Sequence, residues 1–149
     1  MELNPGDKAP SFEALDQNGN TVKLQDFAGK KLVLYFYPKD NTPGCTAESC
    51  NLRDNYEAMQ AQGYAVLGVS SDSEASHQKF IEKHSLPFPL LADTDKKVHE
   101  LYGTWGEKSM YGKKYMGTIR TTFVIGEDGT ILDIIKKVKT KDHAKQIIG

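Results

Sequence analysis

The chain has 149 residues, a length that suits one domain with a sizeable hydrophobic core. Its 19 basic and 20 acidic side chains give a formal net charge of −1, so the charge balance indicates neither a nucleic-acid nor an anionic-membrane partner. No apolar run is long enough to span a bilayer, and the N-terminus lacks the basic and apolar regions of a signal peptide. We therefore expect residues 1–149 to form a single cytoplasmic domain whose thiols are kept reduced.

The first predicted elements are a β-hairpin and a buried strand. Phe12–Leu15 and Val22–Leu24 are short strand patterns, and the Asn18-Gly19 pair between them is a strong turn signal. The run Leu32–Tyr37 is continuously apolar and aromatic, which predicts a strand buried on both faces.

Two helices and a second buried strand are predicted next. A helix is expected from Thr46 to about Gln62, because four side chains would then share one face: Cys45, Leu52, Tyr56 and Met59. Ala65–Val69 is the second buried strand. Ser71 and Glu74 have the spacing of a capping box, which predicts a helix that continues through His84.

The rest of the chain is predicted to complete a mixed sheet. In chain order, it begins with an extended segment, Leu86–Leu91, and a short helix, Lys96–Tyr102. A long loop without clear period is expected over Trp105–Thr118. Thr121–Ile125 and Ile131–Val138 form a hairpin, and a last helix spans about Lys141–Ile148. The middle of the chain requires parallel pairing through a helical crossover, and its end is antiparallel. The expected fold is therefore α/β, with a mixed central β-sheet flanked by helices.

The two cysteines, Cys45 and Cys50, carry the most informative chemistry. Pro43 and Gly44 precede Cys45 at the start of a helical pattern, and a helix N-terminus favours the reactive thiolate. Two thiols alone make a poor zinc site, and the scattered histidines do not complete one. We interpret those histidines as surface or helix-face residues: His77, His84, His99 and His143. Burial of both thiols as small core residues stays open, more so for Cys50.

Helix geometry constrains what the two thiols can do. Residues five apart are displaced by about 7.5 Å along the helix axis and about 140° around it, which separates their Cα atoms by roughly 8.7 Å. A disulfide rarely tolerates more than about 7 Å. Cys45 and Cys50 therefore cannot bond within an intact helix, but they can if the first turns unwind.

Four segments together resemble the peroxiredoxin family. Pro38–Cys45 has the spacing of the family signature: a proline, then a threonine, then the peroxidatic cysteine. Cys50 resembles the resolving cysteine of the bacterioferritin comigratory protein (PrxQ) subgroup. Ala9–Phe12 is similar to the family's opening, and Arg120–Ile125 to the strand that supplies its active-site arginine. The match covers essentially the whole chain in consistent order.

The resemblance implies a thioredoxin-like fold and the reduction of hydrogen peroxide and organic hydroperoxides. It assigns Cys45 as the nucleophile and Cys50 as the resolving thiol. It places Thr42 and Arg120 around the peroxide, with Pro38 shielding the site. Thiolate attack on a peroxide oxygen gives a sulfenic acid, and Cys50 would then attack this group to form an intramolecular disulfide.

The residue types fit these roles, although other interpretations remain. Thr42 can donate and accept a hydrogen bond, but it could equally be an ordinary loop hydroxyl. Arg120 can stabilise both the thiolate and the leaving oxygen, whereas its spacing alone would favour a surface ion pair. Glu48 belongs either to this polar network or to the solvated first turn of the helix.

Turnover also requires partners that the residues alone do not identify. The resemblance implies thioredoxin or a similar dithiol as reductant, and a monomer. No motif for a metal, haem, flavin or nucleotide is present, so we expect no cofactor. Two other functions stay open. A thiol-disulfide oxidoreductase would usually carry Cys-x-x-Cys, and a non-enzymatic redox sensor would use Cys45 oxidation only to change a surface.

Overall fold

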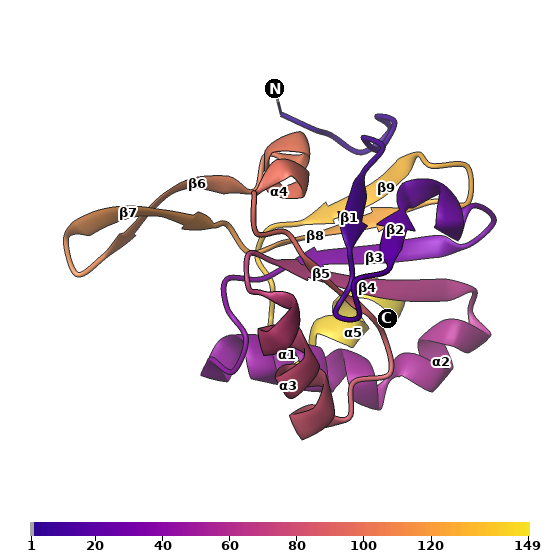
Figure 1. Cartoon of the computed structure of the whole chain (residues 1–149). Coiled ribbons are helices and arrows are strands. Elements are labelled where there is room, and N and C mark those ends of the chain that lie inside the picture. The colour runs from indigo at the N-terminus through magenta and orange to yellow at the C-terminus, as the bar shows by residue number, and fades with distance from the viewer. Residues whose placement is uncertain (1) are drawn as a thin grey trace.

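The computed structural model describes residues 2–149 and has a five-stranded mixed sheet at its centre (Figure 1). The spatial order of the strands is β5, β4, β3, β8 and β9. Their bounds are β3 (Lys31–Phe36), β4 (Tyr64–Ser70), β5 (Leu90–Ala92), β8 (Thr121–Ile125) and β9 (Ile131–Ile135). The neighbours β3, β4 and β5 are parallel, whereas β8 and β9 are antiparallel, which confirms the predicted mixed sheet.

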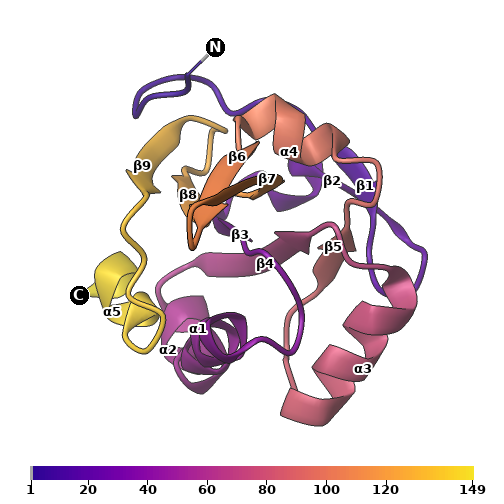
Figure 2. The ribbon, with the colours of Figure 1, turned by 90° about the vertical axis from the view of Figure 1, so that its left-hand side faces the viewer.

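Helices cover both faces of this sheet. Four of them pack below it in the view of Figure 1: α1 (Pro43–Asp54), α2 (Tyr56–Ala61), α3 (Glu74–His84) and α5 (His143–Ile148). The opposite face carries α4 (Lys97–Tyr102), the 3-10 turn η1 (Leu24–Phe27) and the hairpin of β1 (Glu13–Leu15) and β2 (Thr21–Lys23). Figure 2 shows the same two layers on either side of the strands. No helix within residues 2–149 is both long and apolar enough to cross a membrane.

The central strand β3 contributes to both cores. Its side chains alternate between the two faces, as the two-residue period of a strand requires. Those facing α4 are Leu32, Leu34 and Phe36, and those facing α1, α2 and α3 are Val33, Tyr35 and Tyr37. All six are 0–1% exposed, so the continuous apolar run predicted the buried strand correctly.

The segment predicted as a long loop is a second hairpin, so that prediction was wrong. Here β6 (Trp105–Met110) pairs antiparallel with β7 (Lys113–Thr118), and the hairpin projects from the body of the molecule (Figure 1). Tyr111 and Gly112 form the turn, both with positive φ angles of 53° and 79°. A tyrosine is unusual at such a position, where Asn or Gly is preferred, so the sequence carried no turn signal. Most of the hairpin is exposed, which removes the alternating pattern as well.

The helix predicted from Thr46 to Gln62 is interrupted at Asn55. The side-chain amide of Asn55 donates to the carbonyl of Asn51 at 2.8 Å, and its main-chain N–H also reaches the carbonyls of Asn51 and Leu52. Such local bonds compete with the regular helical ladder. The chain therefore continues as a separate short helix, α2, although its core residue Met59 remains fully buried as predicted.

Other differences concern the ends of elements. Ser73, rather than Ser71, is the N-cap of α3, because its hydroxyl accepts the main-chain N–H of Ser76. The extended segment contributes only the three residues of β5, β9 ends at Ile135, and the last helix begins at His143.

Close packing of the central strands predicts a cost for any side chain at Gly68. This glycine lies opposite Tyr35, and a Cβ atom there would be 2.6 Å from Leu90 Cδ2 and 2.9 Å from Tyr35 Cζ. Gly68→Ala is expected to lower the free energy of unfolding by about 1–3 kcal/mol, measured by urea denaturation. Ser109→Ala, at an exposed hairpin position, is the control. Equal stability of the two variants would contradict this account of the packing.

Candidate active site

The sheet topology brings Cys45 and Arg120 together although they are 75 positions apart in the chain. Strand β3 ends at Phe36 and leads, through a short loop, into the N-terminus of α1. Phe36 pairs with Thr121, the first residue of the antiparallel strand β8. The residue before Thr121 therefore lies at the same sheet edge as the loop that precedes α1.

Cys45 lies in the first turn of α1 and is only 1% exposed. Its sulfur accepts a hydrogen bond from Arg120 Nη2 at 3.3 Å. A fixed guanidinium and the positive end of a helix thus both face the thiol, and both favour the thiolate. Cys45 and Cys50 are free thiols in this structure, and the predicted position of Cys45 at a helix N-terminus is confirmed.

Glu48 completes the cluster one helical turn after Cys45. Its Oε1 accepts a hydrogen bond from Arg120 Nη1 at 2.5 Å, so this guanidinium joins the carboxylate to the thiol. Glu48 is fully buried, and within residues 2–149 its Oε2 has no hydrogen-bond partner. Burial raises the pKa of Glu48 to about 7, against the opposing effect of Arg120. The structure thus places Glu48 in the polar network rather than in solvent.

Arg120 holds its charge between these two groups. Burial opposes the charged guanidinium, but Glu48 and Cys45 outweigh it and raise the pKa of Arg120. The side chain is 24% exposed, so it is neither a solvated surface residue nor shut off from solvent. Its permanent positive charge is available where negative charge develops on sulfur or oxygen.

His143 of α5 closes the buried side of the cluster as a neutral acceptor. Its Nδ1 donates to Gln146 Oε1 at 2.7 Å, because the amide of Gln146 is oriented by its own bond to the Lys137 carbonyl. Burial lowers the pKa of His143. Its Nε2 therefore accepts the hydroxyl proton of Thr122 and has no proton to offer Glu48 Oε2, 3.6 Å away.

The interpretation of the histidines as surface or helix-face residues needs correction. All four lie on helices, but three are fully buried: His77, His99 and His143. His77 and His99 each bond through Nδ1 to a buried aspartate, at 2.7 and 2.6 Å. Sequence reasoning missed these residues because no spacing rule links a histidine to a partner on another element.

Thr42 and Pro38 lie in the loop between β3 and α1. Thr42 is the N-cap of α1 by its main-chain carbonyl, and its hydroxyl donates to the Lys39 carbonyl at 2.8 Å. That hydroxyl still has lone pairs free to accept a hydrogen bond. Pro38 lies two residues after the end of β3 and is half-buried. Within residues 2–149, the Thr42 hydroxyl bonds to no member of the Cys45–Arg120–Glu48 cluster.

Cys50 lies farther along the same intact helix and is half-buried. The adjacent Asn51 is held by the C-terminal segment: its Nδ2 donates to the Lys141 carbonyl at 3.0 Å, and its Oδ1 accepts the Ala144 N–H at 2.7 Å. The predicted separation of the two thiols by a helix in the reduced state is therefore present. The bonds of Asn51 anchor the helix to the C-terminal segment just beyond Cys50.

Sequence comparison places this chain among named relatives. The model of the AhpC/TSA family matches residues 5–134. The chain is 47% identical over 148 residues to peroxiredoxin Bcp of Bacillus subtilis (strain 168), covering 99% of this chain and 94% of that one. It is 46% identical over 147 residues to peroxiredoxin Bcp of Escherichia coli (strain K12), with the same coverage of 99% and 94%.

Solved structures agree with this result. A PrxQ mutant from Xylella fastidiosa has a TM-score of 0.92 and 33% identity, covering 99% of this chain and 94% of that chain. The bacterioferritin comigratory protein of Xanthomonas campestris, studied for alkyl peroxide reduction, has a TM-score of 0.86 and 36% identity. That alignment covers 92% of this chain and 87% of the other.

The raised pKa of Glu48 predicts a loss of stability as the pH rises. The unfolded chain releases this proton near pH 4.5 and the folded protein near pH 7, so the folded state holds the proton between those values. The contribution is fully present at about pH 4.5 and is lost as the pH rises through about 7. This contribution to the free energy of unfolding is on the order of 3 kcal/mol. Glu48→Gln removes the contribution because the amide does not titrate.

Urea unfolding of the reduced protein at pH 5 and pH 8 measures this effect. The wild-type protein is expected to lose more stability over that interval than Glu48→Gln. The exposed Glu57→Gln serves as the matched control and should behave as the wild type does. An identical pH dependence in all three proteins would show that Glu48 is ionised throughout.

Proposed function

Since the chain belongs to the AhpC/TSA family of peroxiredoxins and is a thiol-dependent peroxidase, we propose that Cys45 is its peroxidatic thiol and Cys50 its resolving thiol. The observation that carries this proposal is the contact between Arg120 Nη2 and the sulfur of Cys45 at the N-terminus of α1. This contact favours the thiolate that the reaction needs.

In the first step, the Cys45 thiolate attacks one oxygen of a hydroperoxide, ROOH. The O–O bond breaks, sulfur takes the attacked oxygen as a sulfenic acid, and RO⁻ leaves and takes up a proton to become an alcohol or water. Arg120 stabilises the negative charge as it moves from sulfur to the leaving oxygen. Thr42 offers its free lone pairs to the peroxide O–H, and Pro38 shields the site from water.

In the second step, the thiol of Cys50 attacks the sulfenic sulfur of Cys45. An S–S bond forms, the S–O bond breaks, and one water molecule leaves. Because both cysteines lie in α1 at roughly 8.7 Å between Cα atoms of an ideal helix, the first turns must unwind before this bond can form. This is the mechanism of an atypical two-cysteine peroxiredoxin.

The third step restores the thiols at the expense of an external dithiol, which becomes a disulfide. We propose thioredoxin or a similar dithiol protein as this reductant, and both hydrogen peroxide and organic hydroperoxides as substrates. Reduction of alkyl peroxides by the Xanthomonas campestris relative supports the organic substrates. Attack and resolution both use residues of one chain, and we propose that the protein acts as a single-domain monomer in a reducing cytoplasm.

Loss of the Arg120 charge is expected to slow the first step. Arg120→Met should lower the second-order rate constant for sulfenic acid formation by about 100-fold or more, because removing one preorganised charge donor typically costs that much. Arg120→Lys keeps the charge but cannot bond to Cys45 and Glu48 through two nitrogens. Its rate constant should lie between those of Arg120→Met and the wild type. Rapid quenching with mass spectrometry of Cys45 measures the rate, and Cys45→Ser supplies the blank.

Two outcomes would refute the assignment. Substantial peroxide turnover by Cys45→Ser would place the nucleophile elsewhere. An unchanged rate in Arg120→Met would show that the contact with Cys45 plays no part in attack.

The proposed role of Cys50 predicts a local change in α1 on oxidation. After one equivalent of peroxide, the amides from Cys45 to Cys50 should lose protection from hydrogen exchange. The distal part of the helix, held by Leu52 and Asn51, should keep it. Cys50→Ser should form sulfenic acid at the normal rate but fail to recycle, and should over-oxidise in excess peroxide.

Hydrogen exchange of the reduced and oxidised forms tests the unwinding, and mass spectrometry tests the fate of Cys45. Equal protection of the Cys45–Cys50 amides in the two states would rule out unwinding. Full recycling of Cys50→Ser by thioredoxin would show that resolution does not need this thiol.

A further inference from the structure

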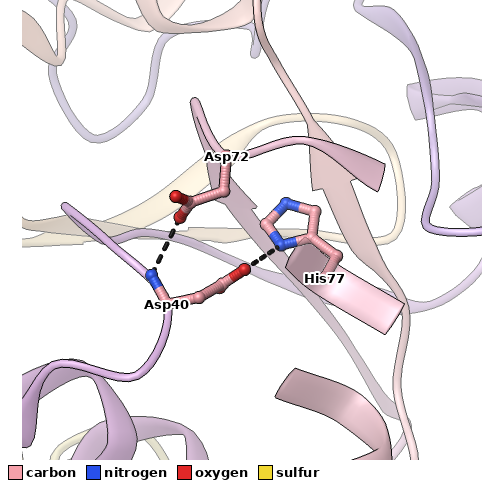
Figure 3. A group of neighbouring side chains, drawn as sticks. All are labelled: Asp40, Asp72 and His77. Atoms are coloured by element: carbon pink, nitrogen blue, oxygen red, sulfur yellow. Dashed lines mark hydrogen bonds and ion pairs between the residues drawn. The ribbon is translucent and has the colours of Figure 1, made fainter. Parts of the chain in front are cut away.

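A second buried polar cluster lies beside the loop that carries the active site. We name it the Asp40 cluster, after the residue at its centre; the other members are Tyr37, Asp72, Ser76 and His77. Asp40 lies between Pro38 and Thr42 in sequence and is 5% exposed. Its side chain points to His77 and its main chain to Asp72, as Figure 3 shows.

The carboxylate of Asp40 accepts three hydrogen bonds. Its Oδ1 accepts the Tyr37 hydroxyl at 2.6 Å, and its Oδ2 accepts Ser76 Oγ at 2.8 Å and His77 Nδ1 at 2.7 Å. Burial raises the pKa of Tyr37 well above its usual value, so the phenol remains a donor. Three donors satisfy the hydrogen-bonding needs of this buried carboxylate. Removing any one of them leaves a carboxylate oxygen without one of its hydrogen bonds.

His77 is committed at both ring nitrogens. Nδ1 faces Asp40 Oδ2, and Nε2 lies 2.8 Å from the main-chain carbonyl of Leu91, which can only accept. Each ring nitrogen of His77 therefore has a hydrogen-bond partner, and the ring links Asp40 to the Leu91 carbonyl. Both side chains are almost fully buried.

This arrangement argues against a metal site at the cluster. Asp40, Asp72 and His77 offer ligand atoms within 4.8 Å of one another, which is close enough for one cation. Both ring nitrogens of His77 already have hydrogen-bond partners, Nδ1 at Asp40 and Nε2 at the Leu91 carbonyl. The Oδ2 atom of Asp72 already accepts the Asp40 N–H at 2.8 Å and the Ser70 hydroxyl at 2.7 Å. Binding of a cation here would require these side chains to give up hydrogen bonds that they already make.

The cluster instead anchors the loop between β3 and α1 to the rest of the fold. Asp40 is joined to the end of β3 through Tyr37, to the loop before α3 through Asp72, and to α3 itself through Ser76 and His77. The His77 ring is in turn bonded to β5. The next residue of the loop, Asn41, has a positive φ of 62°, a conformation uncommon for residues other than glycine.

We propose that Asp40 and His77 are positioning residues for the peroxidase reaction, which fix the loop before α1 so that the Cys45 sulfur stays against Arg120. The unwinding that lets Cys50 reach Cys45 starts immediately after this fixed point. The Asp40 cluster therefore favours the helical state that attacks peroxide and opposes the unwound state that forms the disulfide. This second consequence rests on the proposed role of Cys50.

The proposal predicts opposite changes in two rates. Loosening the loop should slow attack of Cys45 on peroxide and speed disulfide formation, because the unwound state becomes more populated. A faster disulfide step also protects the sulfenic acid, so more peroxide is needed to over-oxidise half of Cys45. General destabilisation of the fold would not separate the two rates in this way.

His77→Leu is the main test, because it removes both bonds of the ring. We expect at least a tenfold lower rate constant for sulfenic acid formation and about a tenfold higher ratio of disulfide to sulfinic acid in excess peroxide. His77→Asn, whose amide nitrogen can replace Nδ1 as the donor to Asp40, should restore part of the attack rate. His84→Leu makes the same change two turns along α3, outside the cluster, and is the matched control.

Further variants keep the test decisive if His77→Leu folds poorly. Ser76→Ala removes only one of the three donors and should change both rates in the same directions by a smaller factor. Val98→Ala lowers stability from the opposite core and should leave the ratio of products unchanged. Hydrogen exchange of the amides from Asn41 to Cys45 should increase in the His77 and Ser76 variants alone.

The outcomes distinguish this inference from the proposed function. In a Cys50→Ser background the attack rate still reports on the loop, so a slower rate in His77→Leu supports the positioning role even if Cys50 is not the resolving thiol. Attack rates in His77→Leu and Ser76→Ala equal to that of His84→Leu would overturn it. The inference would also be overturned if the ratio of disulfide to sulfinic acid in the His77→Leu and Ser76→Ala variants equalled that of Val98→Ala.

Discussion

A single guanidinium organises the buried polar site of this protein. Arg120 bonds to the Cys45 sulfur with one nitrogen and to the Glu48 carboxylate with another. A donor of this kind holds both groups at once and keeps its charge at any physiological pH. Without it, the fully buried Glu48 would have no hydrogen-bond partner within residues 2–149, and the thiol would lose the adjacent positive charge.

The surrounding structure holds this guanidinium and its partners from three sides. Pairing of β8 with β3 sets the position of Arg120, and the N-terminus of α1 sets that of Cys45. Beneath them, His143 and Thr122 hydrogen-bond to each other and so do not compete for the Arg120 nitrogens. The outer side remains partly open, since Arg120 keeps about a quarter of its side-chain surface exposed.

The same helix has to satisfy two opposing requirements. The proposed attack on peroxide needs α1 folded so that Cys45 lies against Arg120, whereas the proposed disulfide needs its first turns unwound. The structure divides the helix accordingly. Asn51 anchors its C-terminal part through hydrogen bonds to the C-terminal segment, and Leu52 does so through complete burial. The segment between Asp40 and Cys50 is therefore the part that is proposed to open.

Much of the fold followed from local pattern in the sequence. The apolar run of β3 predicted a buried strand, and the order of elements predicted a mixed sheet. The Pro43-Gly44 pair indicated a helix start near Cys45, although α1 begins two residues earlier, at Pro43. These features depend on side-chain periodicity and on backbone preferences within a few residues, which a sequence displays directly. The spacing of the family signature likewise identified the thiol and the arginine before their contact was known.

Only the tertiary structure decided which distant groups meet. Glu48 could have been solvated, and His77, His99 and His143 could have been surface residues, because a polar side chain has no periodic signal for its partner. The β6–β7 hairpin lacked both a favoured turn residue and a buried face. Asn55 broke the predicted helix through a bond of its own side chain. The sequence by itself thus determined most of the elements and the position of Cys45 at a helix N-terminus, whereas the packing of strands and helices determined the charges and hydrogen bonds around that thiol, since those depend on contacts between residues far apart in the chain.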